Sequence, residues 1–126
     1  MHSVQAYQDV AMYSEVLGAS GHRQIQLLFN KLSADVETAS KALEQQDIKK
    51  KCEAISKAHH IVVFLRGLLA EEEQGRSELE KRLDGIYGYL EAQLFVANNK
   101  NDAAALQRCR EIINHLNSWW DNFEYK

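Results

Sequence analysis

The chain has no proline and only two cysteines among its 126 residues. Without proline, no position removes a backbone donor from the interior of a helix, so the composition favours long uninterrupted helices over a loop-rich sheet protein. Helical spacing directs both Cys52 and Cys109 inward. We therefore expect two buried thiols in a reducing cytosol, and not a disulfide or a metal site.

Long apolar runs and a basic excess are also missing. No stretch approaches the roughly 18 apolar residues of a membrane span, and the N-terminus has no charged leader followed by an apolar core. The formal net charge is -3, which argues against a nucleic-acid footprint. These absences predict a cytoplasmic protein with no membrane insertion and no nucleic-acid partner. At this length we expect a single domain.

Motifs that carry chemistry are absent as well. The sequence has no Glu-x-x-His pairs, no Cys-x-x-Cys-His segment and no glycine-rich phosphate loop, so we expect no enzyme activity, no cofactor and no metal. His59 and His60 are the nearest reactive groups, and a histidine phosphotransfer domain is the alternative interpretation. Such domains place a lysine and a glycine three and four residues after the histidine. Val62 and Val63 stand there instead, and they suit helix packing.

Four helices are predicted from caps and periodicity. At 1.5 Å per residue, helices of about 20 to 25 residues span about 30 to 38 Å, and short turns make such rods pack antiparallel. The expected fold is all-α: an antiparallel four-helix bundle over 20–126, preceded over 1–19 by an N-terminal arm or short cap helix. The predicted helices are one capped by Ser20 that ends near 46, one capped by Asp47 over 48–72, one capped by Ser77 or its neighbour that ends near 98, and one capped by Asp102.

Each predicted helix carries an apolar stripe at helical spacing, and this stripe is expected to form the core. The inward residues are Ile25, Leu28, Leu32, Val36, Ala39 and Leu43 in the first helix; Ile48, Cys52, Ile55, Val62 and Leu69 in the second; Leu83, Ile86, Leu90, Leu94 and Ala97 in the third; and Leu106, Cys109, Ile113, Leu116 and Trp120 in the fourth.

Two helices carry more apolar surface than a bundle core requires. Tyr87 and Tyr89 lie on the two flanks of the third stripe, and Phe95 points largely away from it. In the second helix, Val63 and Phe64 point away from the core. Surplus apolar surface of this kind is typical of a groove that binds a partner helix. Coverage by the N-terminal arm, or a central place in a larger oligomer, would also explain it, and the sequence leaves these alternatives open.

Several segments resemble one known family in order and spacing. The run Ile86-Tyr87-Gly88-Tyr89-Leu90, followed by Ala97-Asn98 and Asn101-Asp102, resembles the third long helix of the flagellin-specific export chaperones, the FliS family. Gly88 departs from the pattern, since an acidic residue is common there. The other similar segments are Tyr7 with Ala19-Ser20 and the run from Ile25 to Asn30, the turn from Leu43 to Ile48, the start of the second long helix from Glu53 to Ala58, and Trp119 near the end.

The resemblance implies a non-enzymatic cytoplasmic chaperone. Such a protein binds the disordered C-terminal segment of flagellin, prevents premature polymerisation and delivers flagellin to the flagellar type III export gate. Self-association as a weak homodimer is left open. Val4 and Tyr7 match the positions that help the family dock at the gate, although Tyr7 can equally be an anchor for the terminus. The residues expected to bind flagellin are Leu27, Val63, Phe64, Tyr87, Tyr89, Phe95 and Asn98, the last of which a helix C-cap would also explain.

Overall fold

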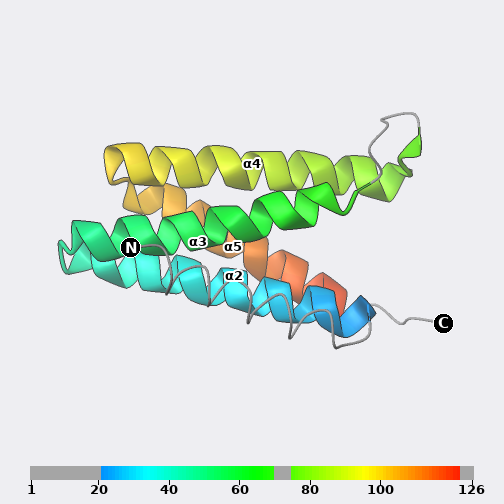
Figure 1. The fold of residues 1–126 in the computed structure, drawn as a ribbon, viewed down its shortest axis with the longest axis horizontal. Helices are drawn as coiled ribbons and strands as arrows, with labels where there is room; N and C mark the ends of the chain where they lie inside the picture. The colour runs from blue at the N-terminus through cyan, green and yellow to red at the C-terminus, as the bar shows by residue number, and fades with distance from the viewer. Residues whose placement is uncertain (1–20, 70–74, 123–126) are drawn as a thin grey trace, which may run out of the picture.

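The computed structural model describes residues 21–69 and 75–122, which fold into four α-helices joined by short turns (Figure 1). This confirms the predicted all-α class and the four-helix bundle. The expected N-terminal arm over 1–19, with Val4 and Tyr7, lies outside the described residues. The helices are α2 from Gly21–Glu44, α3 from Ile48–Gly67, α4 from Glu78–Lys100 and α5 from Ala103–Asp121.

Local side-chain chemistry sets the helix starts as predicted. The Asp47 side chain accepts a hydrogen bond from the backbone N–H of Lys50 at 3.1 Å. Ser77 forms a capping box with the glutamate three residues later, since each side chain bonds the other's backbone N–H. Asp102 accepts two backbone bonds, at 2.9 and 3.3 Å, from the first turn of α5. The cap predicted at Ser20 lies outside the described residues.

The helix ends differ from the prediction by a few residues. The second helix was expected to reach residue 72, but α3 ends at Gly67, where the next two backbone N–H groups bond three residues back at 3.2 Å each. This tighter turn stops the α-helical pattern, and Leu68 beyond it is 56% exposed. α4 extends to Lys100, two residues past the predicted end, because Asn101 adopts a left-handed φ of 52° and closes the helix.

The four helices form a closed ring around one core. α2 packs on α3 and α5, and α4 completes the ring by packing on the same two helices. The prediction for Ile48 was wrong, because this first residue of α3 lies at the end of the bundle and is 45% exposed. The predicted inward residues that are buried are Leu28, Leu32, Val36 and Ala39 in α2; Ile55 and Val62 in α3; Leu90, Leu94 and Ala97 in α4; and Leu106, Cys109, Ile113 and Leu116 in α5.

α4 and α5 meet at their connecting turn and then diverge. Figure 1 shows α5 running behind α3 toward the start of α2, while the start of α4 lies at the opposite edge of the bundle. The Trp120 indole Nε1 donates to the backbone carbonyl of His22 at 2.8 Å, and the two rings stack at 4.9 Å. Gln26 Nε2 donates to Asp121 Oδ1 at 2.7 Å. These contacts hold the last turn of α5 against α2 and away from α4.

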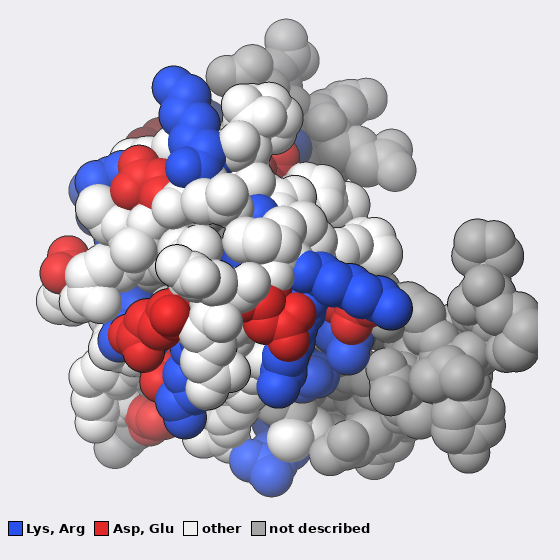
Figure 2. All heavy atoms as spheres, turned by 90° about the vertical axis from the view of Figure 1, so that its left-hand side faces the viewer, with Lys and Arg blue, Asp and Glu red and all other residues white. Residues whose placement is uncertain are grey.

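The surface at the end with the short turns mixes both signs of charge. Figure 2 shows that end, where basic and acidic side chains interleave. Glu37 lies between Lys41 and Arg110, and Asp102 lies beside Arg108. No continuous basic surface forms on this face of the described chain. Across residues 21–69 and 75–122, no helix combines the length and the hydropathy needed to cross a membrane.

Candidate functional site: apolar grooves beside α4

A groove of about 250 Å³ lies between α3 and the second half of α4 and contains two of the predicted binding residues. Phe95 is 69% exposed beside it, and Asn98 lies at its end. Val63 comes one helical turn after His59 on α3 and is 48% exposed, so it extends the same flank. We call this site the α3–α4 groove. Its lining residues are Ile55, Ser56 and His59 from α3, with Glu91, Leu94, Phe95 and Asn98 from α4.

Two other predicted residues lie outside this groove. Phe64 follows Val63 by 100° around α3 and packs partly against the core. Leu27 is half-buried on α2 and does not line the α3–α4 groove. The structure therefore does not bring Leu27 or Phe64 into the α3–α4 groove.

The two tyrosines of α4 have different environments. Tyr87 was expected to be surplus surface, which is wrong: it is only 3% exposed, because α3 covers that flank of α4. Burial raises the pKa of its hydroxyl to about 12. Tyr89 is 41% exposed on the opposite flank, four residues before Gln93, which accepts a 2.7 Å bond from Arg108 of α5. Tyr89 and Phe95 therefore face different sides of α4.

A buried lysine fixes the end of the α3–α4 groove. Lys51 is 2% exposed, and its Nζ donates to the backbone carbonyl of Asn98 at 2.9 Å and to Asn101 Oδ1 at 2.6 Å. The ammonium group therefore lies at the C-terminal end of α4, where the helix dipole favours a cation. The C-cap of α4 is Asn101 and not Asn98, so the capping explanation of Asn98 was wrong. Sequence analysis missed Lys51, although it occupies an inward position one turn before Ile55.

A charged cluster bounds the groove at its other end. Arg66 Nε donates to Asp84 Oδ1 at 2.6 Å and Nη1 donates to Glu91 Oε2 at 3.4 Å, while Arg76 pairs with Asp84 at 3.2 Å. The hydrogen bond from Arg66 is the main reason that the pKa of Asp84 is lowered, and the same bond raises the pKa of Arg66. A Cβ at Gly88 would lie 3.4 Å from the Arg66 guanidinium. This is an ordinary van der Waals distance, so the Arg66 guanidinium packs over Gly88 on α4.

The two adjacent histidines lie at the surface of α3. His59 and His60 are exposed, with ring centroids 6.5 Å apart, and His59 lines the α3–α4 groove. Their neighbours are the buried Val62 and the exposed Val63, so the local wall is apolar, as the sequence indicated. Such a wall does not suit a phosphoryl group. In the part of the chain that the structure describes, no cluster of three or more histidine, cysteine or acidic side chains is placed to hold a metal ion.

The two cysteines are free thiols with unequal burial. Cys109 is buried as predicted, and burial raises its pKa to about 12. Cys52 is only half-buried, so the prediction of two buried thiols holds for one of them. At neutral pH the Cys109 thiol stays protonated and unreactive, because the thiolate is the nucleophilic form.

Comparisons with known proteins agree with the resemblance seen in the sequence. A family model described as flagellar protein FliS matches residues 3–126. The flagellar secretion chaperone FliS of Vibrio cholerae is 34% identical over 119 residues, which cover 94% of this chain and 86% of the relative. The flagellar secretion chaperone FliS of Salmonella typhimurium is 33% identical over 125 residues, which cover 98% of this chain and 90% of the relative. The flagellar secretion chaperone FliSB of Pseudomonas aeruginosa is 34% identical over 125 residues, which cover 99% of this chain and 98% of the relative.

Proposed function

Because the chain belongs to the FliS family of flagellar secretion chaperones, we propose that it binds the disordered C-terminal segment of flagellin in the bacterial cytosol. Bound flagellin is kept from polymerising and is delivered to the flagellar type III export gate. The proposed activity is binding and not catalysis. The partners it requires are the flagellin segment and the export gate.

The observation that carries this proposal is the exposed apolar surface of the α3–α4 groove. Ile55 and Leu94 form an apolar floor, while Val63 and Phe95 stand at its edge with about half or more of their surface in water. Contiguous apolar surface on a soluble protein typically marks a partner site. An amphipathic helix that lays its apolar face into such a groove is a recurrent mode of peptide recognition.

Energetics indicate that the client contacts more than this one groove. Ordering a disordered segment takes about 2 to 5 kcal/mol from the gross interaction energy. Full burial of one large apolar side chain gains about 1.5 to 3 kcal/mol, so the remaining exposed surface of Val63 and Phe95 does little more than offset that cost. Tight binding therefore needs further surface outside the groove, and Tyr89, Leu27 and Phe64 are the predicted residues that could supply it.

The direct test is titration of the protein with a peptide from the C-terminal end of the host's flagellin. We expect one-to-one binding, a gain in helical circular dichroism and a negative heat-capacity change, because the client orders and buries apolar surface. Absence of binding at peptide concentrations of about 50 µM, which corresponds to less than about 6 kcal/mol of affinity, would overturn the proposal.

Replacement of Phe95 tests the groove itself. Phe95→Ala should weaken the peptide by about 2 kcal/mol, or roughly thirtyfold, since buried aromatic anchors dominate interfaces of this kind. Leu68→Ala is a suitable control, because Leu68 is 56% exposed and lies at the end of α3 outside the groove. Equal affinities of the two variants, measured by calorimetry, would exclude the α3–α4 groove as the binding surface.

The proposed export role of Val4 and Tyr7 is tested in cells. Tyr7→Ala should leave flagellin binding unchanged and reduce flagellin export, if Tyr7 docks the loaded chaperone at the gate. Flagellin in the culture medium and calorimetric affinity are the two readouts. Normal export by the variant would contradict gate docking and would favour Tyr7 as an anchor of the terminus.

A further inference from the structure

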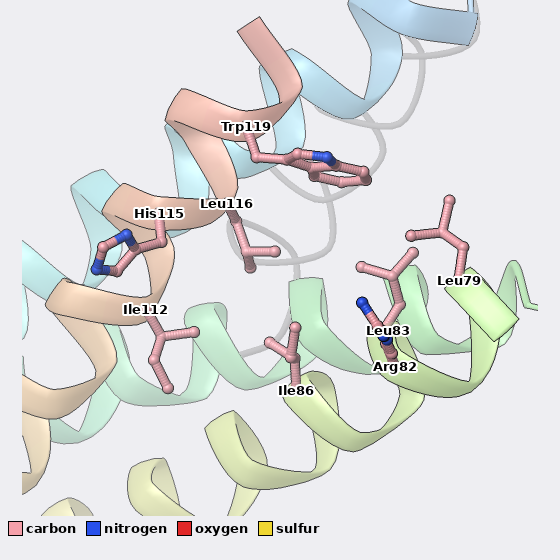
Figure 3. A pocket seen from close by; sticks show the side chains of 8 residues that line it. All are labelled: Leu79, Arg82, Leu83, Ile86, Ile112, His115, Leu116 and Trp119. Carbon is pink, nitrogen blue, oxygen red and sulfur yellow. The ribbon is translucent and has the colours of Figure 1, made fainter. Parts of the chain in front are cut away.

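A second hollow, of about 350 Å³, lies between the start of α4 and the end of α5 (Figure 3). The contacts of Trp120 with His22 hold the end of α5 against α2, so that α5 leaves α4 in this region. We call this hollow the α4–α5 cleft. Its lining residues are Leu79, Arg82, Leu83 and Ile86 from α4, with Ile112, His115, Leu116 and Trp119 from α5.

The interior of the α4–α5 cleft is apolar and is closed at one end. Six of its eight lining side chains are apolar, and Leu116 is only 5% exposed. Arg108 donates to Gln93 at 2.7 Å, one to two turns beyond the lining residues, and this bond bridges α5 to α4. At the other end, Leu79 and Trp119 stand on opposite walls (Figure 3), and Leu79 is 45% exposed. A ligand therefore enters at the end where Leu79 lies.

The two remaining lining residues are basic and have no partner in the described chain. Arg82 and His115 are both exposed, and neither makes a hydrogen bond or an ion pair with any residue of 21–69 or 75–122. Long side chains on a helix lean toward its N-terminus, so Arg82 leans toward the open end of the cleft. A guanidinium at this place favours a carboxylate, because the pair forms two parallel charge-assisted hydrogen bonds.

The size of the cleft indicates a small ligand with one alkyl chain. Small-molecule sites typically enclose about 300 to 1,000 Å³ and combine apolar walls with a few polar groups. The lining residues of each wall span two helical turns, so the cleft is about 10 Å long at 1.5 Å per residue. An extended chain of about eight to ten carbons fills this length.

We propose that the α4–α5 cleft binds a free medium-chain fatty acid, with its alkyl chain along the apolar walls and its carboxylate at the open end beside Arg82. This site is separate from the α3–α4 groove, and the inference does not rest on flagellin being the client. Arg82 determines the preference for an anion, and the bridge from Arg108 to Gln93 limits the length of the chain. The ligand covers Leu79 and Trp119, which are otherwise in contact with water.

The test is calorimetric titration of the full chain with hexanoate, octanoate and decanoate, each below its micelle concentration. Octanol is the uncharged probe. Affinity should rise about fifteenfold for each two carbons, because each methylene that leaves water adds about fourfold. Arg82→Gln should weaken octanoate about tenfold and leave octanol unchanged. Lys49→Gln is the matched control, since it removes the same charge at an exposed position on α3.

Fluorescence locates the ligand. Trp119 lines the cleft, so octanoate should change the tryptophan emission of wild type. The Trp119→Phe variant should lose that change and keep the emission of Trp120, which is held by His22 on α2. A change of the same size in the variant would place the ligand outside the cleft and overturn the inference. Circular dichroism of each variant establishes that it is folded.

The titrations can also overturn the inference. Failure of decanoate to bind at about 1 mM would exclude a fatty-acid site. Equal affinities of Arg82→Gln and Lys49→Gln for octanoate would exclude recognition of the carboxylate by Arg82. An affinity that does not rise from hexanoate to decanoate would exclude an alkyl chain in the cleft. Because the flagellin peptide is titrated separately, none of these results bears on the proposed function.

Discussion

Lys51 is a buried cation in a core made otherwise of apolar side chains and Asp35. Its ammonium group joins the first turns of α3 to the last turn of α4 through the Asn98 carbonyl and the Asn101 amide. Burial of a charge is tolerated only when hydrogen bonds replace those lost from water. Lys51 therefore positions the end of the groove and does not itself contact a partner.

Removal of this ammonium group should destabilise the fold. Lys51→Met keeps the length of the side chain but leaves the two oxygen acceptors of α4 without their donor, at a cost of about 2 kcal/mol. Urea unfolding followed by circular dichroism measures the difference. Lys50→Met is the matched control, since Lys50 is exposed and uses only its backbone N–H in the cap of α3. Equal stabilities would show that the buried bonds contribute nothing.

The burial of single side chains could be predicted from the sequence only in part. Periodicity identified Phe95 and Val63 as exposed, because a side chain that points away from the core has nothing to cover it. It failed for Tyr87, since a flanking residue is buried or exposed according to which neighbouring helix lies against it. It missed Lys51 because a lysine at an inward position is normally assigned to the surface.

The turn between α4 and α5 shows how much one short segment determines. Asn101 adopts a left-handed backbone and closes α4, and Asp102 caps α5. The Asn-Asp pair that contributed to the family resemblance thus ends one helix and begins the next. Helix starts were predicted well because a cap is local chemistry. The end of α3 was not predicted, because it depends on the tighter turn after Gly67, where two backbone N–H groups bond three residues back.

Two replacements at Asn101 separate its backbone and side-chain roles. Asn101→Gly removes the bond to Lys51 but tolerates the φ of 52°, whereas Asn101→Ala removes the bond and also strains the backbone. We expect the alanine variant to be less stable by about 1 kcal/mol. The comparison is made by urea unfolding under identical conditions. A glycine variant no more stable than alanine would contradict a requirement for the left-handed backbone.

At the scale of the whole molecule, α4 lies between two hollows, the α3–α4 groove and a cleft beside α5. The antiparallel four-helix bundle was predicted, since antiparallel packing follows from short turns. The divergence of α4 and α5 was not predicted, because it depends on contacts between Trp120 and His22, which are 98 positions apart in the chain. That divergence leaves a cleft between α4 and α5. The apolar pattern of one helix cannot predict such a cleft, because it depends on how two helices lie relative to each other.

Client binding should stabilise this bundle against heat. A ligand that binds only the folded state adds about 2.7 kcal/mol when its concentration is 100 times Kd. For a domain of this length the corresponding rise in Tm is about 10 °C. Differential scanning calorimetry with the flagellin peptide measures the shift, and a peptide of scrambled sequence is the control. A scrambled peptide that raises Tm equally would show that the stabilisation is not specific.

The position of α5 has a consequence for synthesis of the chain on the ribosome. α2, α3 and α4 pair with their neighbours in sequence, so these contacts can form as each helix emerges. α5 packs against α2 through pairs 73 to 98 positions apart, and long-range contacts of this kind form late. Until α5 has emerged, the apolar faces of α2 and α4 that it covers remain in water. A stalled nascent chain therefore exposes an aggregation-prone seam that the finished bundle conceals.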